Sequence, residues 1–215
     1  MKQLADPRPG AAPQVRIRPY ERGDADRVRA MSALLSKRSL YERFFAGTPA
    51  LPSMYLAALA KVDHHDREAL LALSEKPDEP EEVVVGIAEY IRDRAMPARA
   101  DLAVLVADDW QRRGIGRRLV TELARLAARR GIAEFGADTL VTNRPALAAV
   151  NSAWPDARPE RDGNTAAFRL PVYALLAGTP GIPVKPQARK GGEFHPGLHA
   201  QLRPGCAAGT RAGMA

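Results

Sequence analysis

The stretch from Leu102 to Leu119, LAVLVADDWQRRGIGRRL, decides the fold of this chain. It opens with an apolar run that predicts a buried strand over Leu102–Ala107, and a turn containing Gly114 and Gly116 follows. From Gly114 to about Arg130, apolar residues recur on one side of a helix. The stretch therefore predicts a strand, a glycine turn and a long amphipathic helix in direct succession.

The start of this predicted helix carries an unexpected charge. The exposed N–H groups of a first helical turn already form a positive end, which acidic residues normally complement. Here the flanking residues are basic: Arg112, Arg113, Arg117 and Arg118. Cations at this end destabilise a helix unless an anion neutralises them, and glycines allow that anion to approach the backbone. The pattern favours a binding site for a polyanion, most simply a pyrophosphate.

The chain before this stretch is predicted to form one strand, three helices and a hairpin. Alternation of Val15 and Ile17 with arginines predicts a strand that ends at Pro19. The helices are predicted from Asp24, as N-cap, through Leu35, from a capping box of Ser39 and Glu42 towards Phe45, and over Ser53–Lys61. The hairpin pairs strands Glu68–Leu73 and Val83–Ile91 across the connection Lys76–Glu82.

After the long helix, the elements alternate. The sequence predicts a strand over Glu134–Val141, a short helix opened by Asn143 with Pro145 in its first turn, and a strand over Ala166–Leu170. Strands that first pair as a meander and then alternate with helices imply an α/β (mixed α+β) fold. We expect a twisted mixed sheet of six to seven strands flanked by helices.

Length and composition favour a single domain. The chain has 215 residues, of which 46% are hydrophobic and 27% charged, as in ordinary globular proteins. Residues 1–14 are predicted to be a loose leader and residues 15–171 the folded domain. Residues 172–215 are rich in glycine and proline, and +4 of the net charge of +7 lies there. We expect this tail to be disordered.

The sequence gives no indication of a membrane or metal protein. Its longest apolar run, Leu102–Ala107, is far shorter than the roughly 20 residues of a membrane-spanning helix. The N-terminal residues contain no apolar signal region, and the one cysteine, Cys206, cannot form an internal disulfide. A cytoplasmic location is therefore expected. His64 and His65 lack further ligands at suitable spacing, so no metal site is predicted.

One motif gives the chain a family resemblance. Gln111-Arg112-Arg113-Gly114-Ile115-Gly116 matches the pattern Gln/Arg-x-x-Gly-x-Gly/Ala of the GNAT superfamily of acyl-CoA-dependent N-acetyltransferases, and it follows a strand and opens a helix as in that family. The resemblance extends over about residues 15–171. Three segments of the chain also resemble those of the bacterial protein-lysine acetyltransferases that act on acyl-CoA synthetases. These segments are Ser39–Phe45, Asp63–Asp66 and Ala107–Gln111.

The resemblance implies a binding site for acetyl-CoA as the acyl donor. Val104 and Val106 would pair through their backbone with the pantetheine arm. The backbone amides of Arg112 to Arg117, which include those of Gly114, Ile115 and Gly116, would bind the pyrophosphate, with Gln111 opening the motif. Asn143 would lie beside the pantetheine or the departing sulfur, and Leu147 would form an apolar wall.

The reaction requires a base, because a lysine-type amine with a pKa of about 10.4 is mostly protonated at neutral pH. Asp101 stands where many members of the family have glutamate and is the expected base, acting directly or through a water. Glu89 on the preceding strand is the alternative carboxylate. Residues 143–154 contain no tyrosine to protonate the leaving thiolate, whose pKa of about 8.5 allows solvent to do so.

These observations predict an N-acetyltransferase that moves an acetyl group to a primary amine, for which a protein lysine is one candidate, by direct attack in a ternary complex. Two alternatives stay open. The lack of a tyrosine in residues 143–154, and the aspartate at residue 101 in place of the longer glutamate, also fit a non-catalytic acyl-CoA-binding regulatory module. The arginines of residues 112–130 and the basic tail also fit a nucleic-acid-binding protein, for which salt-dependent DNA binding without coenzyme affinity would be diagnostic.

Overall fold

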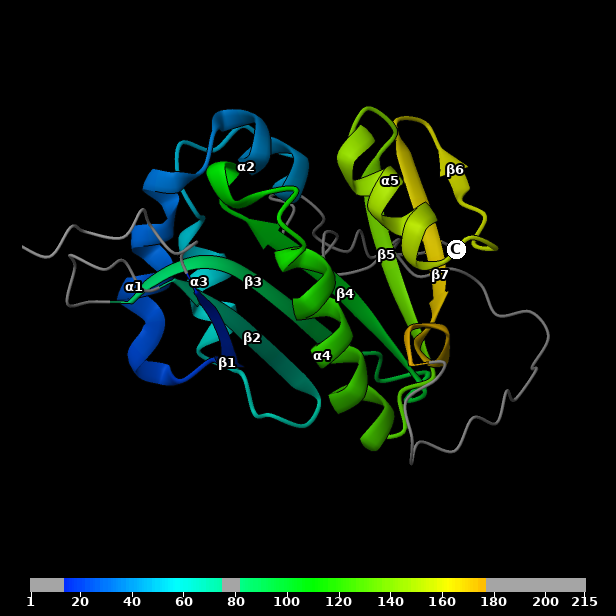
Figure 1. Cartoon of the computed structure of the whole chain (residues 1–215). Coiled ribbons are helices and arrows are strands. Elements are labelled where there is room, and N and C mark those ends of the chain that lie inside the picture. The colour runs from blue at the N-terminus through cyan, green and yellow to red at the C-terminus, as the bar shows by residue number, and fades with distance from the viewer. Residues whose placement is uncertain (1–13, 75–81, 177–215) are drawn as a thin grey trace, which may run out of the picture.

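A seven-stranded sheet runs through residues 14–74 and 82–176, which are the residues that the computed structural model describes (Figure 1). The strands lie in the order β1-β2-β3-β4-β5-β7-β6. Every neighbouring pair is antiparallel except β4 and β5, which are parallel. The strands are β1 Val15–Pro19, β2 Arg67–Ser74, β3 Val83–Arg92, β4 Arg99–Val106, β5 Glu134–Leu140, β6 Glu160–Asp162 and β7 Thr165–Pro171.

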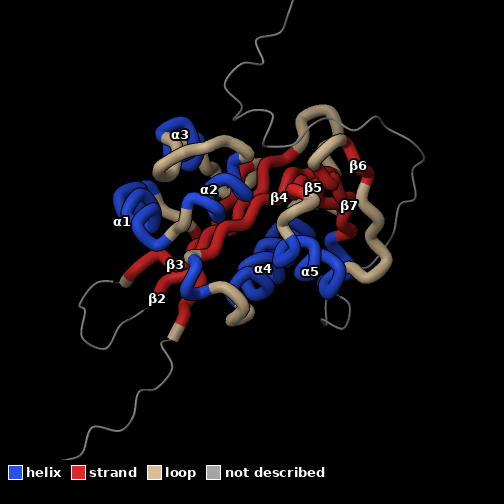
Figure 2. Tube along the Cα trace, turned by 90° about the horizontal axis from the view of Figure 1, so that it is seen from above, coloured by secondary structure: helices blue, strands red, loops and turns tan. Residues whose placement is uncertain are grey.

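Helices cover both faces of the sheet (Figure 2). One face carries α1 (Ala25–Ala30), α2 (Lys37–Phe44) and α3 (Ser53–Leu59), and the other carries α4 (Ile115–Arg129) and α5 (Arg144–Ala153). Each face has its own apolar core. Leu119, Leu123 and Ala127 of α4 pack with Phe135 and Phe168, whereas Leu40 of α2 and Tyr55 of α3 pack with Leu71 and Ile87. The predicted mixed sheet flanked by helices is thus confirmed.

The parallel pair of strands opens shortly after it begins. β4 pairs with β5 at three positions only, Arg99 with Glu134, Ala100 with Phe135 and Asp101 with Gly136. On its other edge β4 stays paired with β3 as far as Val106. Beyond Asp101 the two parallel strands therefore diverge, as the ribbons of β4 and β5 show in Figure 1.

The predicted capping box at Ser39 is wrong. Helix α2 begins at Lys37, because Ser36 caps it and the Ser36 Oγ accepts the backbone N–H of Ser39 at 3.1 Å. Glu42 pairs instead with the side chain of Arg38 along the same helix, at 2.8 Å. Ser36 was available as a cap in the sequence, and its own tertiary contacts, described below, favour the earlier start.

The other predicted helices and strands are present, with ends that differ from the predicted ones by a few residues. Two further features of the fold were not predicted. β6 is a short edge strand paired with β7, and its charged sequence gave no strand signal. Packing of the core continues past the predicted boundary at residue 171, because Val172 and Leu176 are buried against α4 and its neighbours. The predicted loose leader, apart from Gln14, and the tail after Leu176 lie outside the described residues.

Asp24 lies before α1 as predicted, but its carboxylate does not cap the helix. It accepts two hydrogen bonds of 2.6 Å from the guanidinium of Arg18 on β1 and one from the backbone N–H of Glu21. The helix that begins after it is an α-helix only to Ala30 and continues as a 3-10 turn over Met31–Leu34. Asp24 therefore ties this helix to the first strand.

The Asp24 ion pair should make stability depend on pH. The hydrogen bond from Arg18 lowers the pKa of the Asp24 carboxyl, so its contribution is complete above the unfolded pKa of about 3.9 and is lost as pH falls through the lower folded pKa. Asp24→Asn should reduce the free energy of unfolding at pH 7 by about 2 kcal/mol and should lose less stability than the wild type on acidification. Urea unfolding of the two proteins, at pH 7 and at a pH below the ordinary pKa of aspartate, measures both free energies of unfolding.

Asp26 provides the matched control, because its carboxylate is 89% exposed and, among the described residues, pairs only with Arg29 on the same helix. Asp26→Asn should leave the unfolding free energy nearly unchanged at either pH. Equal effects of the two substitutions would contradict the role given to Asp24.

Candidate active site

A run of unpaired backbone amides lies at the start of α4. Gly114, with φ of +78°, forms the N-cap, and the first backbone hydrogen bond of the helix joins the N–H of Arg118 to the carbonyl of Gly114 at 3.0 Å. Within the described residues, the six N–H groups from Arg112 to Arg117 find no acceptor in a side chain or in the backbone. Six adjacent donors at the positive end of a helix form a binding site for an anion.

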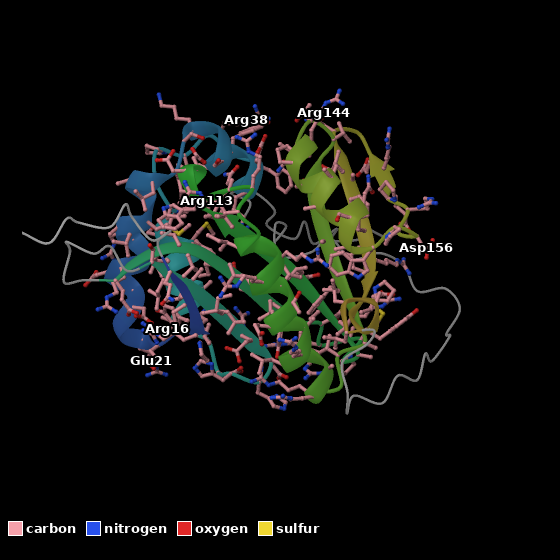
Figure 3. All side chains as sticks on the ribbon, in the orientation of Figure 1. Arg16, Glu21, Arg38, Arg113, Arg144 and Asp156 are labelled. Carbon is pink, nitrogen blue, oxygen red and sulfur yellow. The ribbon has the colours of Figure 1, made fainter. Side chains whose placement is uncertain are left out.

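The basic side chains around this turn differ in their contacts. The guanidinium of Arg113 stacks on the ring of Trp110 at 5.0 Å, and Arg112 and Arg117 are exposed. Arg118 instead donates to the carbonyl of Val15 on β1 at 2.9 Å, so its side chain holds α4 against β1. In Figure 3, Arg38 on α2 and Arg144 on α5 also lie at the end of the molecule towards which β4 and β5 diverge.

The edge of β4 that faces the opening presents alternate backbone groups. The N–H of Ala107 donates to the carbonyl of Val85 on β3 at 2.9 Å, so the odd-numbered groups of β4 are turned towards β3. The even-numbered groups, among them those of Val104 and Val106, are therefore turned towards β5, which pairs with β4 only up to Asp101. Val104 and Val106 thus lie on an open strand edge.

The helix start and the open edge adjoin each other. A Cβ added to Gly116 would lie 3.8 Å from Val106 Cγ2 and 3.9 Å from Val104 Cγ1, so this residue packs directly on the two valines. On the other side of the opening, Asn143 caps α5 by accepting the N–H of Ala146 at 3.1 Å, and Leu147 is half-buried against the same core. The structure brings the predicted donor-binding residues together around one opening.

Asp101 lies at the point where the two strands separate. It is half-buried, and its Oδ1 atom would be 3.2 Å from a Cβ on Gly136, so the absence of a side chain at that residue leaves room for the carboxylate. A cavity of about 40 Å³ adjoins it. Its lining includes three carboxylates and two guanidinium groups, from Asp93, Asp101, Glu134, Arg99 and Arg169.

The side chain of Glu89 lies on the same face of the sheet as that of Asp101, but its surroundings differ. Its carboxylate is buried and pairs with the Arg43 guanidinium of α2, with 2.6 Å between Oε1 and Nη2. Burial raises the pKa of the Glu89 carboxyl above its ordinary value, and the attraction of Arg43 offsets this only in part. The Arg43 guanidinium also lies 5.3 Å from the ring centre of Tyr55 on α3. Glu89 is therefore part of a closed ion pair beneath α2 and α3.

A second polar cluster, which the sequence did not predict, ties α2 to the turn before α4. The Asp108 carboxylate accepts the backbone N–H of Ser36 at 2.7 Å and the hydroxyl of Ser39. The Gln111 side chain donates from Nε2 to Asp108 Oδ1 and to the carbonyl of Val106, both at 3.1 Å. Burial alone would raise the pKa of the Asp108 carboxyl, but the hydrogen bonds from the two serines lower it below its usual range.

Comparison with known families identifies the domain. A model of the acetyltransferase (GNAT) family matches residues 36–151, which is more than half of the chain and includes the turn, the open strand edge and most of α5. This chain belongs to the GNAT acetyltransferase family. In the described residues of this GNAT domain, no helix combines the length and the apolar character needed to cross a bilayer.

Solved structures agree with the family assignment. The GNAT domain of S. lividans PAT superposes with a TM-score of 0.64 and 26% identity, over 73% of this chain and 90% of that one. The protein yncA from Salmonella typhimurium, solved with its cofactor acetyl-CoA, has the same fold with a TM-score of 0.56 and 17% identity, over 74% of this chain and 94% of that one. A cAMP-binding acyltransferase from Mycobacterium smegmatis shares the fold at a TM-score of 0.52 and 21% identity, over 89% of this chain and 52% of that one.

The buried ion pair of this GNAT domain should be important for stability. Glu89→Gln leaves the Arg43 cation buried without its counter-ion, and we expect the free energy of unfolding to fall by about 3–5 kcal/mol. Glu42→Gln is the matched control, because it breaks the exposed pair with Arg38 on the same helix and should cost less than about 0.5 kcal/mol. Equal losses in denaturant unfolding would show that the buried pair has no special role.

Proposed function

We propose that this chain transfers the acetyl group of acetyl-CoA to a primary amine by direct attack in a ternary complex. The observation that carries the proposal is the run of six free amides at the start of α4, placed against an open strand edge. The free amides suit the pyrophosphate of acetyl-CoA, and the open strand edge suits the amide groups of its pantetheine arm. The same fold in yncA, which was solved with acetyl-CoA, supports this choice of donor. Acetyl-CoA is a cytoplasmic metabolite, so the proposed reaction belongs in the cytoplasm.

The spacing along β4 suits this donor. The amides of Arg112 to Arg117 would hold the pyrophosphate, and the exposed guanidinium groups of Arg112 and Arg117 would neutralise its charge. From Val106 down to Asp101, five residues of strand cover about 16 Å. An extended pantetheine arm is of similar length, so the thioester would come to lie near the point where β4 and β5 separate. Asn143 and Leu147 would close the other side.

We assign the role of base to Asp101 rather than to Glu89. Asp101 lies at the separation point and lines a cavity over the paired starts of β4 and β5, whereas Glu89 is closed off by Arg43. Asp101 would accept a proton from the ammonium of the acceptor, directly or through a water, and the neutral nitrogen would attack the thioester carbon. The backbone N–H of Val106 or Val104 on the open edge would stabilise the oxyanion. As the intermediate collapses, the nitrogen releases its second proton to solvent, and the expelled thiolate takes a proton from solvent, because α5 and its flanks contain no tyrosine.

The charge of the cavity lining suits an amine acceptor. Three carboxylates and two guanidinium groups line the cavity, and Glu134 pairs with Arg99 at 2.8 Å, so the lining carries a net charge of −1 that attracts an ammonium. A lysine side chain fits, because it carries its charge at the end of a flexible aliphatic stem. The likeness to the GNAT domain of S. lividans PAT supports a protein lysine as acceptor.

A turnover assay tests the proposal. The purified full chain should release free CoA thiol from acetyl-CoA when lysine-containing peptides or proteins are added, and mass spectrometry should find the acetyl group on the ε-amine. Aminoglycosides and other bulky amines serve as competing acceptor classes, and acetylation of these alone would overturn the lysine assignment. Binding of acetyl-CoA without turnover on any amine would favour a non-catalytic acyl-CoA-binding module.

A further inference from the structure

The open edge of β4 is not fully free. The Val106 carbonyl, which is turned towards the opening, accepts a hydrogen bond from Gln111 Nε2 at 3.1 Å. This carbonyl is the kind of acceptor that an amide N–H of the pantetheine arm would need. Resting on the proposed function, we infer that the Gln111 side chain is a latch on the Val106 carbonyl that only a donor carrying its own amide N–H replaces.

The partners of Gln111 allow this latch to open without leaving either hydrogen of the Gln111 side-chain amide unpaired. Its side-chain amide has two hydrogens and three acceptors in reach, since Asp108 Oδ1 lies at 3.1 Å and Ser39 Oγ at 3.4 Å besides the Val106 carbonyl. When Gln111 leaves Val106, both hydrogens still find acceptors on Asp108 and Ser39. The Val106 carbonyl, in contrast, needs a new donor on the strand edge.

The latch therefore discriminates between ligands that offer an amide N–H to the edge of β4 and ligands that do not. A ligand that only fills the turn, through a pyrophosphate, leaves the contact between Gln111 and Val106 intact. A ligand with a pantetheine arm supplies an N–H to the edge and displaces Gln111 onto Asp108 and Ser39. Ser39 belongs to α2, so the displaced side chain strengthens the tie between the donor turn and that helix. Gln111 is thus a residue that determines donor specificity.

Isothermal titration of CoA and of adenosine 5′-diphosphate tests this inference, because both carry a pyrophosphate and only CoA carries the amides. Gln111→Met keeps the approximate length and volume of the side chain but cannot donate a hydrogen bond. Without the latch to displace, this variant should bind CoA about threefold to tenfold more tightly than the wild type. Its affinity for adenosine 5′-diphosphate should stay within about twofold of the wild-type value, since that ligand does not compete for Val106.

Gln111→Ala should reproduce the result, and because Gln111 is exposed, both variants should fold normally. Weaker or unchanged CoA binding in both variants would overturn the latch, as would equal changes for the two ligands. The wild-type titration separates this failure from that of the proposed function. If the wild type binds CoA and the variants do not bind it more tightly, the latch alone is wrong; if the wild type does not bind CoA, both are wrong.

Discussion

Replacing Asp101 with alanine is expected to lower kcat by about a hundredfold to ten-thousandfold, the usual contribution of a general base. The carboxylate lies where β4 and β5 separate and lines the cavity assigned to the acceptor, so its loss leaves the ammonium without a proton acceptor. Acetyl-CoA affinity should change little, because the amides of Arg112 to Arg117 are one strand length away. Steady-state kinetics and calorimetry on the same preparations measure both quantities.

Two further variants define this role. Asp101→Asn keeps the shape of the side chain and should be as inactive as the alanine variant, whereas Asp101→Glu retains a carboxylate and should recover part of kcat. The activity of the alanine variant should rise steeply with pH, because more acceptor amine is then neutral without help. An alanine variant with wild-type kcat would remove Asp101 from the mechanism.

Replacing Gly114 with aspartate is expected to weaken acetyl-CoA binding by about a thousandfold. No atom lies within 4 Å of a Cβ built at this residue, so the loss does not come from a steric clash. It comes from a carboxylate placed beside the bound pyrophosphate, where two like charges about 4 Å apart repel by about 4 kcal/mol near a protein surface. The positive φ of +78° adds a smaller strain.

Gly114→Asn separates charge from strain, because asparagine has nearly the same shape as aspartate and tolerates positive φ. It should bind acetyl-CoA within about tenfold of the wild type, with the difference set by backbone strain alone. Binding of acetyl-CoA by the aspartate variant with wild-type affinity would show that the phosphate does not lie at this turn.

The part of the fold and site that the sequence predicts well is local in the chain. Strand, glycine turn and helix follow one another between Leu102 and Arg130, and their hydrophobic periods and turn residues are strong signals. Because the turn decides where backbone amides are exposed, the proposed donor site follows from this one stretch. The position of Asp101 at the strand separation also follows from its place at the start of β4, once the order of strands is known.

The features that the sequence does not predict depend on contacts between distant residues. Nothing local distinguishes Glu89, a candidate base, from a carboxylate buried against Arg43, which is 46 residues earlier. In the sequence, nothing distinguishes Asp108 from any other acid at a strand end, and only α2 places Ser36 and Ser39 beside it. The same contacts explain why α2 begins at Lys37, since Ser36 is fixed at both its hydroxyl and its N–H.

The most direct test of the account is a calorimetric titration of the purified full chain with acetyl-CoA. The free amides at the start of α4 and the open edge of β4 predict saturable binding at one site per chain, weakened strongly in the Gly114→Asp variant. No detectable heat of binding at millimolar acetyl-CoA would contradict the placement of the donor at this turn, and with it the proposed reaction.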